Sequence, residues 1–244
     1  MTPEELVAVA CPKIGTLGFA YYFVPETAAR AVELGLDTFG FYFLGRGGVL
    51  GDVDAAVVAS AFGYFKPELV AQMWDAARAV LPPREAGAAY HLACADLGRR
   101  RLVDVEGLED FCAAAEAVDA AADPVGLPLY AGMSAEPRVD DPAGRAMQLV
   151  TVLRELRGSA HLLAVRAVGL DAKQAHWISR PDAIALFGWT EEEAPAVDAA
   201  DRTAMAEAHA LTDRLVTPAF AVLDEAGQAA LLTGLDRIEA ALAR

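Results

Sequence analysis

Apolar side chains recur every three to four positions along most of this chain, which is the period of an amphipathic helix. The clearest stripe lies in a segment that begins near Pro142 and continues to Gly169. Its apolar positions are separated by four, three, four and three residues, so they share one helix face: Leu149, Leu153, Leu156, Ala160 and Leu163. No segment shows the sustained alternation of a strand ladder. The pattern therefore predicts an all-α fold, a multi-helix bundle.

Capping residues and prolines divide the chain into further helices. We expect them at 3–10, 25–35, 54–61, 67–81, 84–101, 106–122, 171–179, 181–187, 201–216 and 225–243, with a short one begun by Thr190. Two segments break the pattern. Residues 37–53 combine glycines with a run of aromatics, which predicts a bent, irregular segment, and the proline-rich residues 123–142 predict a long connection. The pattern indicates an aromatic-rich helical domain at 1–125 and a second domain at 140–244.

The net charge limits which kinds of molecule this chain is expected to bind. The chain is 55% hydrophobic, enough for a sizeable core, and its 35 acidic and 20 basic residues give a net charge of −15. Nucleic acids and anionic membranes repel such a chain unless its cations cluster. The densest group, Arg99 to Arg101, is typical of a solvated helix end. The first residues have no basic signal-peptide region and no apolar run long enough to span a bilayer, so we expect a cytoplasmic protein.

Two segments carry a resemblance to a known family: LRELRGSAHLLAVRAVGLDAKQAHWIS and PDAIALFGWTEEE. They resemble actinobacterial helical proteins described as helix-turn-helix or winged-helix, several of them encoded near antibiotic biosynthesis genes. YYFVPET, FGFYFLGRGGVLG and YFKPELV resemble the same family. The segment TDRLVTPAFAVLDEAGQAALLTGLDRI is similar to the dimerisation helices of MarR-type regulators. The resemblance implies that 140–244 holds a central helix, a winged-helix region and a dimerisation region.

Departures from the family pattern lead to an expectation against DNA binding. Pro195 cuts short the helix that begins near Thr190, and no wing follows, so the winged helix is degenerate. Residues 181–244 hold twelve acidic and four basic residues, a net charge of −8. Glu191, Glu192 and Glu193 would face the phosphates. Family histidines are replaced by Gly18, Lys66 and Leu156, so a metal or haem function built on them would not transfer.

Aromatic and basic residues suggest a ligand pocket instead. Eleven of the nineteen aromatic residues lie between positions 19 and 65. Arg154, Arg157 and His161 share a face of the long helix. We expect six residues to converge on one cavity that binds an anionic or aromatic small molecule: Tyr22, Arg46, Tyr64, Lys66, Arg157 and His161. The alternatives are an ordinary aromatic core and an exposed, salt-bridged helix face.

Catalytic residues are not identifiable, although His161 is the best candidate. The histidines and cysteines show no metal-ligand spacing, so we expect no metal, and the cofactor is unknown. The sequence thus favours a small-molecule-binding protein of actinobacterial specialised metabolism, which could be a tailoring enzyme, and not a DNA reader. The alternatives are a ligand-responsive MarR-like transcriptional regulator and a purely structural or interaction domain. The apolar surface of 225–243 predicts a homodimer through the C-terminal helices.

Overall fold

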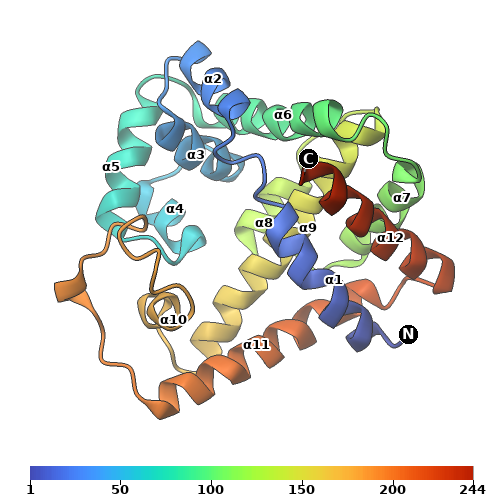
Figure 1. Cartoon of the computed structure of the whole chain (residues 1–244). Coiled ribbons are helices and arrows are strands. Elements are labelled where there is room, and N and C mark those ends of the chain that lie inside the picture. Colours follow the sequence, from blue (N-terminus) through green and yellow to red (C-terminus); the bar gives the residue numbers. More distant parts are fainter. Residues whose placement is uncertain (244) are drawn as a thin grey trace.

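A computed structural model describes residues 1–243, and these residues fold as an all-α bundle without a strand (Figure 1). None of the helices in this range is long and apolar enough to cross a membrane. The α-helices are α1 (Pro3–Leu17), α2 (Pro25–Glu33), α3 (Thr38–Gly47), α4 (Ala55–Phe62), α5 (Pro67–Arg78), α6 (Pro83–Arg101), α7 (Leu108–Ala121), α8 (Pro128–Ser134), α9 (Pro142–Ala167), α10 (Ala172–Ser179), α11 (Ala199–Phe220) and α12 (Glu225–Leu242). The all-α prediction is confirmed.

The central element is α9, which runs through the middle of the molecule (Figure 1). Helices α1, α6, α7, α8, α10 and α11 all pack against it. Its predicted apolar stripe is buried from Leu149 to Ala160, whereas Leu163 is 43% exposed. The last turns of α9 therefore extend beyond the main core, towards α10.

The glycine-rich segment 37–53 is helical from Thr38 to Leu50, so the prediction of an irregular segment is wrong for most of it. Asp37 caps α3, its Oδ1 accepting a hydrogen bond from the Gly40 amide at 2.7 Å. A β-carbon on Gly45 would lie 2.5 Å from Cβ of Tyr90, and one on Gly48 would lie 2.0 Å from the carbonyl oxygen of Pro83. The glycines thus permit α3 and the following 3₁₀ turn, Gly48–Leu50, to pack closely against α6.

Helix α1 continues to Leu17 instead of ending at residue 10. The other departures concern short helices. The predicted connection 123–142 contains α8, which Pro128 opens and which buries Leu129, Tyr130 and Met133. The predicted helix at 181–187 is a series of turns that ends at Gly188, a residue with φ +84°. The helix after Thr190 is a single 3₁₀ turn, Glu191–Glu193, as the early proline at position 195 led us to expect.

The buried apolar residues form two clusters. The main core draws residues from both predicted domains, from Leu6 to Ala241, and the boundary between those domains stays a prediction. A second, smaller cluster joins the end of α9 to α10 and the first half of α11 through Ala164, Val165, Leu170, Ala175, Met205 and Ala208. The end of α9, α10 and the start of α11 thus share a hydrophobic centre of their own.

Candidate functional site

The end of α9 and α10 form a helix-turn-helix connection. The turn is the four residues 168–171, and Gly169 takes a positive φ of +88° that suits glycine. Leu170 points into the small core and is 2% exposed. Asp171 then caps α10, its Oδ1 accepting from the Gln174 amide at 2.7 Å while the Gln174 side chain accepts from the Asp171 amide at 3.1 Å. A short turn containing glycine between two helices is typical of this motif.

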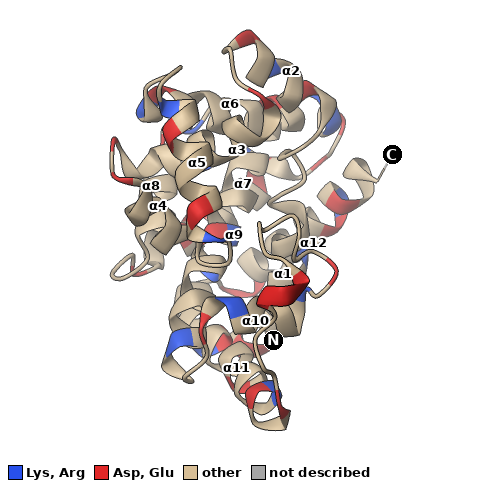
Figure 2. Ribbon diagram, turned by 90° about the vertical axis from the view of Figure 1, so that its left-hand side faces the viewer, with Lys and Arg blue, Asp and Glu red and all other residues tan. Residues whose placement is uncertain are grey.

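The surface of this connection is basic. Residues 166–180 contain three basic side chains and one acidic side chain, a local charge of +2 in a chain of −15. Arg166 is exposed, and the Arg180 side chain is 61% exposed and lies 3.6 Å from Asp182, just beyond this range. Lys173 lies over the ring of Trp189, with its Nζ 4.7 Å from the ring centroid. Figure 2 shows basic segments beside α10 at the lower end of the molecule. We call Arg166, Lys173 and Arg180 the α10 basic surface.

Hydrogen bonds join residues 187–193, which follow α10, to Tyr64 and Lys66. The Trp189 indole donates a hydrogen bond to the carbonyl oxygen of Tyr64 at 2.9 Å, and the Lys66 amide donates to the carbonyl oxygen of Phe187 at 2.9 Å. The Lys66 ammonium bonds Glu193 at 2.6 Å. Lys66 therefore neutralises one of the three consecutive glutamates and does not line the cleft described next.

A cleft of about 230 Å³ lies between α3, α4, α9 and the segment around Phe187. Three of the six residues expected to converge on a pocket line this cleft: Arg46, Tyr64 and Arg157. Tyr22 is not part of the lining but bonds to Glu155, which is. The structure thus brings four of the six together and places Lys66 and His161 elsewhere. Ligand binding by these residues stays a prediction.

Glu155 organises the polar side of the cleft and was not anticipated from the sequence. Its carboxylate is 1% exposed and accepts hydrogen bonds from Arg46 Nε at 3.1 Å and Arg46 Nη2 at 2.8 Å. Arg154 Nη1 donates at 2.8 Å and the Tyr22 hydroxyl at 3.1 Å. Burial alone would raise the pKa of Glu155, but Arg46 and Arg154 hold the pKa at about 2. Glu155 is therefore ionised, and burial keeps the Tyr22 phenol protonated by raising its pKa.

Two donors on residues that line the cleft have no partner within the described chain. The Tyr64 hydroxyl and Arg157 Nε are both buried and make no hydrogen bond there. Arg157 reaches α11 through its Nη2, which lies 3.3 Å from Asp213 Oδ1. Buried donors without partners are costly, so these two atoms are where an acceptor would be stabilised most.

His161 faces α11 rather than the cleft. Its Nδ1 lies 2.7 Å from the Thr212 hydroxyl, which itself donates to the Ala208 carbonyl oxygen at 2.6 Å. The Thr212 proton is used in that bond, so the imidazole Nδ1 carries a proton and donates. The ring stacks on His209 with centroids 4.9 Å apart. Thr212 is fully buried, and a catalytic role for His161 stays a prediction.

A pH dependence of stability follows from this histidine. Burial, followed by the nearby His209 and Arg157, lowers the pKa of His161 from its ordinary 6.5 to about 4. The unfolded chain therefore takes up a proton that the folded chain resists, and stability falls as the pH drops from 6.5 towards 4. Between these values the free energy of unfolding should fall less steeply in His161→Gln than in the wild type, by urea denaturation at several pH values. Equal slopes would contradict this assignment.

A short helix-turn-helix connection at the end of a central helix, with cations on both sides of it, is typical of a helix-turn-helix protein. The chain belongs to the helix-turn-helix family whose family model matches residues 10–244. No curated protein and no solved structure gives a significant match. The membership overturns the expectation that the chain is not a DNA reader. Net charge was a poor guide because DNA contact depends on the local charge of the docking surface.

Proposed function

We propose that this protein is a helix-turn-helix transcriptional regulator that binds DNA through the α10 basic surface and responds to a small molecule in the cleft. The observation that carries the proposal is the local charge of +2 on residues 166–180, on the helix-turn-helix connection of a family member. Cations placed on a docking helix neutralise phosphates and fix the protein on the duplex. A relationship to MarR-type regulators, an actinobacterial origin and a link to antibiotic biosynthesis stay predictions from the resemblance.

The second helix of the connection is the element that would approach the duplex. Helix α10 buries Ala175 and His176, while Ser179 and Arg180 at its end are exposed. Arg166 lies two residues before the turn, and Lys173 is the second residue of α10. These three cations bracket the connection, so α10 can lie against a groove while they contact the flanking phosphates. The 3₁₀ turn Glu191–Glu193 is too short and too acidic to take that place.

The direct test is DNA binding by the full chain. Fluorescence anisotropy would be measured on duplexes of about 30 base pairs that tile the DNA upstream of its own coding sequence, each with a shuffled control. We expect at least one upstream duplex to bind about tenfold or more tightly than its shuffled control, with affinity that falls as salt rises. Absence of binding to every duplex at low salt would reject the proposal.

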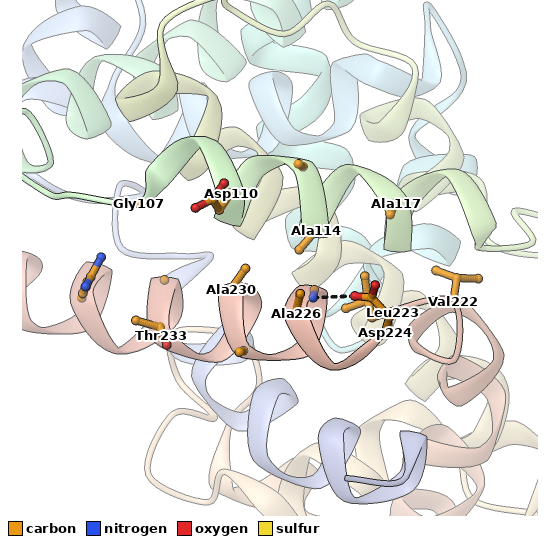
Figure 3. Close-up of a pocket in the computed structure, with 15 residues that line it drawn as sticks. Gly107, Asp110, Ala114, Ala117, Val222, Leu223, Asp224, Ala226, Ala230 and Thr233 are labelled. Atoms are coloured by element: carbon orange, nitrogen blue, oxygen red, sulfur yellow. Dashed lines mark hydrogen bonds between the residues drawn. The ribbon is translucent and has the colours of Figure 1, made fainter.

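We also propose a homodimer, since helix-turn-helix proteins that bind paired half-sites do so as dimers. Helices α7 and α12 border a groove of about 740 Å³ lined mostly by alanines and glycines, among them Ala114, Ala117, Ala226 and Ala230 (Figure 3). Small side chains permit the close approach of another helix. Light scattering is expected to give twice the chain mass of 25.7 kDa, and a monomer at micromolar concentration would reject the dimer.

A further inference from the structure

We infer that the cleft beside α9 takes a small organic monocarboxylate with an apolar body about the size of one aromatic ring, held by the Tyr64 hydroxyl and the Arg157 guanidinium. This inference rests on the proposed function for its consequence, a change in DNA binding, but the binding site itself stands on the geometry of the cleft.

Basic side chains outnumber acidic ones in the cleft. Three arginines line the cleft, Arg46, Arg154 and Arg157, against the single carboxylate of Glu155. Arg46 and Arg154 are engaged by Glu155. Arg157 is not, and its exposed neighbour Asp213 on α11 is held by one weak contact at 3.3 Å. The lining of the cleft thus has a net positive charge, and Arg157 is the cation in it that Glu155 does not engage.

The unpartnered donors locate the anion. The Tyr64 hydroxyl and Arg157 Nε are buried without acceptors. The two groups are close enough for Arg157 to oppose the rise in the Tyr64 pKa that burial causes. Tyr64 is therefore a neutral phenol that donates a proton. A carboxylate has two acceptor oxygens and can satisfy both donors at once, whereas a neutral amide oxygen gains less from the guanidinium.

The remaining walls define the body of the ligand. Most of them are apolar, and half of the apolar side chains are aromatic: Ala61, Phe62, Phe65, Leu129, Leu162 and Phe187. A protein cavity of about 150 Å³ holds benzene, so the observed volume of about 230 Å³ suits one ring with a carboxylate and a short linker. Two-ring compounds exceed it. Benzoate and phenylacetate match this chemistry and serve as probes.

The position of Arg157 connects the cleft to the α10 basic surface. Arg157 and Arg166 lie on the same helix, nine residues apart. The contact between Arg157 and Asp213 joins α9 to α11, and these two helices form the small core that holds α10. A carboxylate on Arg157 Nε would share the guanidinium with Asp213, which contacts Nη2, and so would weaken this contact. We therefore expect a bound carboxylate to weaken the packing of α10 against α9 and α11, and so to weaken DNA binding.

Binding is tested on the full chain without DNA, by calorimetry and thermal unfolding at pH 7.5 with benzoate, phenylacetate, benzamide and acetate. We expect benzoate or phenylacetate to bind at least tenfold more tightly than benzamide or acetate. Tyr64→Phe and Arg157→Gln should each weaken carboxylate binding about tenfold, and Arg157→Lys less than Arg157→Gln. Arg100→Ala, an exposed arginine remote from the cleft, should bind as the wild type does.

The results distinguish failure of the carboxylate site from failure of the proposed DNA-binding function. Equal binding of benzoate and benzamide, or carboxylate binding unchanged in both Tyr64→Phe and Arg157→Gln, would overturn the site. Absence of any stabilisation at about 10 mM probe would also overturn it. Circular dichroism shows whether a variant is folded. This measurement is thus decisive for Arg157→Gln, whereas Tyr64→Phe removes only one hydroxyl.

The coupling has its own test. Adding saturating carboxylate to a DNA complex should weaken DNA binding at least threefold. An unchanged affinity would overturn the coupling, whereas failure to bind any DNA would reject the proposed function and leave the carboxylate result intact.

Discussion

Replacement of Glu155 by glutamine is expected to lower the free energy of unfolding by about 3–5 kcal/mol, the cost of removing one partner from a buried ion pair. The variant leaves Arg46, whose side chain is only 10% exposed, without a counterion, and it gives Arg154 and Tyr22 a neutral amide oxygen in place of the carboxylate that accepts their hydrogen bonds. For a chain of this size the loss corresponds to a fall in Tm of roughly 10 °C.

Two comparisons sharpen this prediction. Arg46→Met should cost less, because Glu155 then keeps Arg154 and Tyr22 as partners. Glu33→Gln removes an exposed carboxylate that pairs with Arg30 at 2.8 Å, and should cost less than about 1 kcal/mol. Urea denaturation measures all three. A loss for Glu155→Gln no larger than that for Glu33→Gln would contradict the assignment of Glu155 as the centre of the polar network.

The same carboxylate predicts an acid dependence. The pKa of Glu155 is about 2 in the folded protein against an ordinary value of 4.5. The unfolded chain therefore binds its proton at a higher pH than the folded chain does. The stability that Glu155 contributes is present above pH 4.5 and is lost as the pH falls towards 2. The difference in unfolding free energy between wild type and Glu155→Gln should shrink over this range.

Removal of the α10 basic surface is expected to weaken DNA binding about 100-fold or more. The variant Arg166→Ala/Lys173→Ala/Arg180→Ala deletes three cations that would each contact a phosphate, and charge-assisted hydrogen bonds contribute about 1.5–3 kcal/mol each. The dependence of log affinity on log salt should fall in slope by about 2.7, at about 0.9 per lost phosphate contact. Anisotropy titrations between roughly 50 and 200 mM salt measure both effects.

The matched control removes the same number of cations elsewhere. Arg99, Arg100 and Arg101 end α6, far along the chain from α10, and Arg99 and Arg100 pair there with Asp96, Asp141 and Glu26. Their replacement by alanine should change the affinity by less than about threefold, the effect of net charge alone. An equal loss in the two triple variants would mean that DNA binding reflects overall charge rather than a surface at α10.

Much of the fold was predictable because helical periodicity is local. The long helix, its cap near Pro142 and its end before Gly169 follow from residue types that are neighbours in the sequence. The helicity of 37–53 was not predictable in this way, since Gly45 and Gly48 are required by Tyr90 and Pro83, which come later in the chain. A glycine in a sequence is usually interpreted as a turn. That it permits close packing of two helices becomes visible only in the folded protein.

The site was less predictable than the fold. Arg46, Tyr64 and Arg157 were anticipated as residue types suited to a pocket, but Glu155 was not, because its partner Arg46 lies 109 positions away. A carboxylate beside Arg154 has the sequence signature of a solvated helix face. The α10 basic surface was missed because its three cations lie seven residues apart and are separated by a turn. Only the fold shows that these charges lie around one helix-turn-helix connection.

The central claim is that DNA docks on the connection between α9 and α10. Hydrogen–deuterium exchange of the full chain, with and without a bound upstream duplex, tests it most directly. We predict that DNA slows amide exchange most in peptides covering residues 166–180, while peptides from α6 and α7 are unchanged. Protection confined to other segments, such as the end of α6 at residues 99–101, with none at 166–180, would contradict the account.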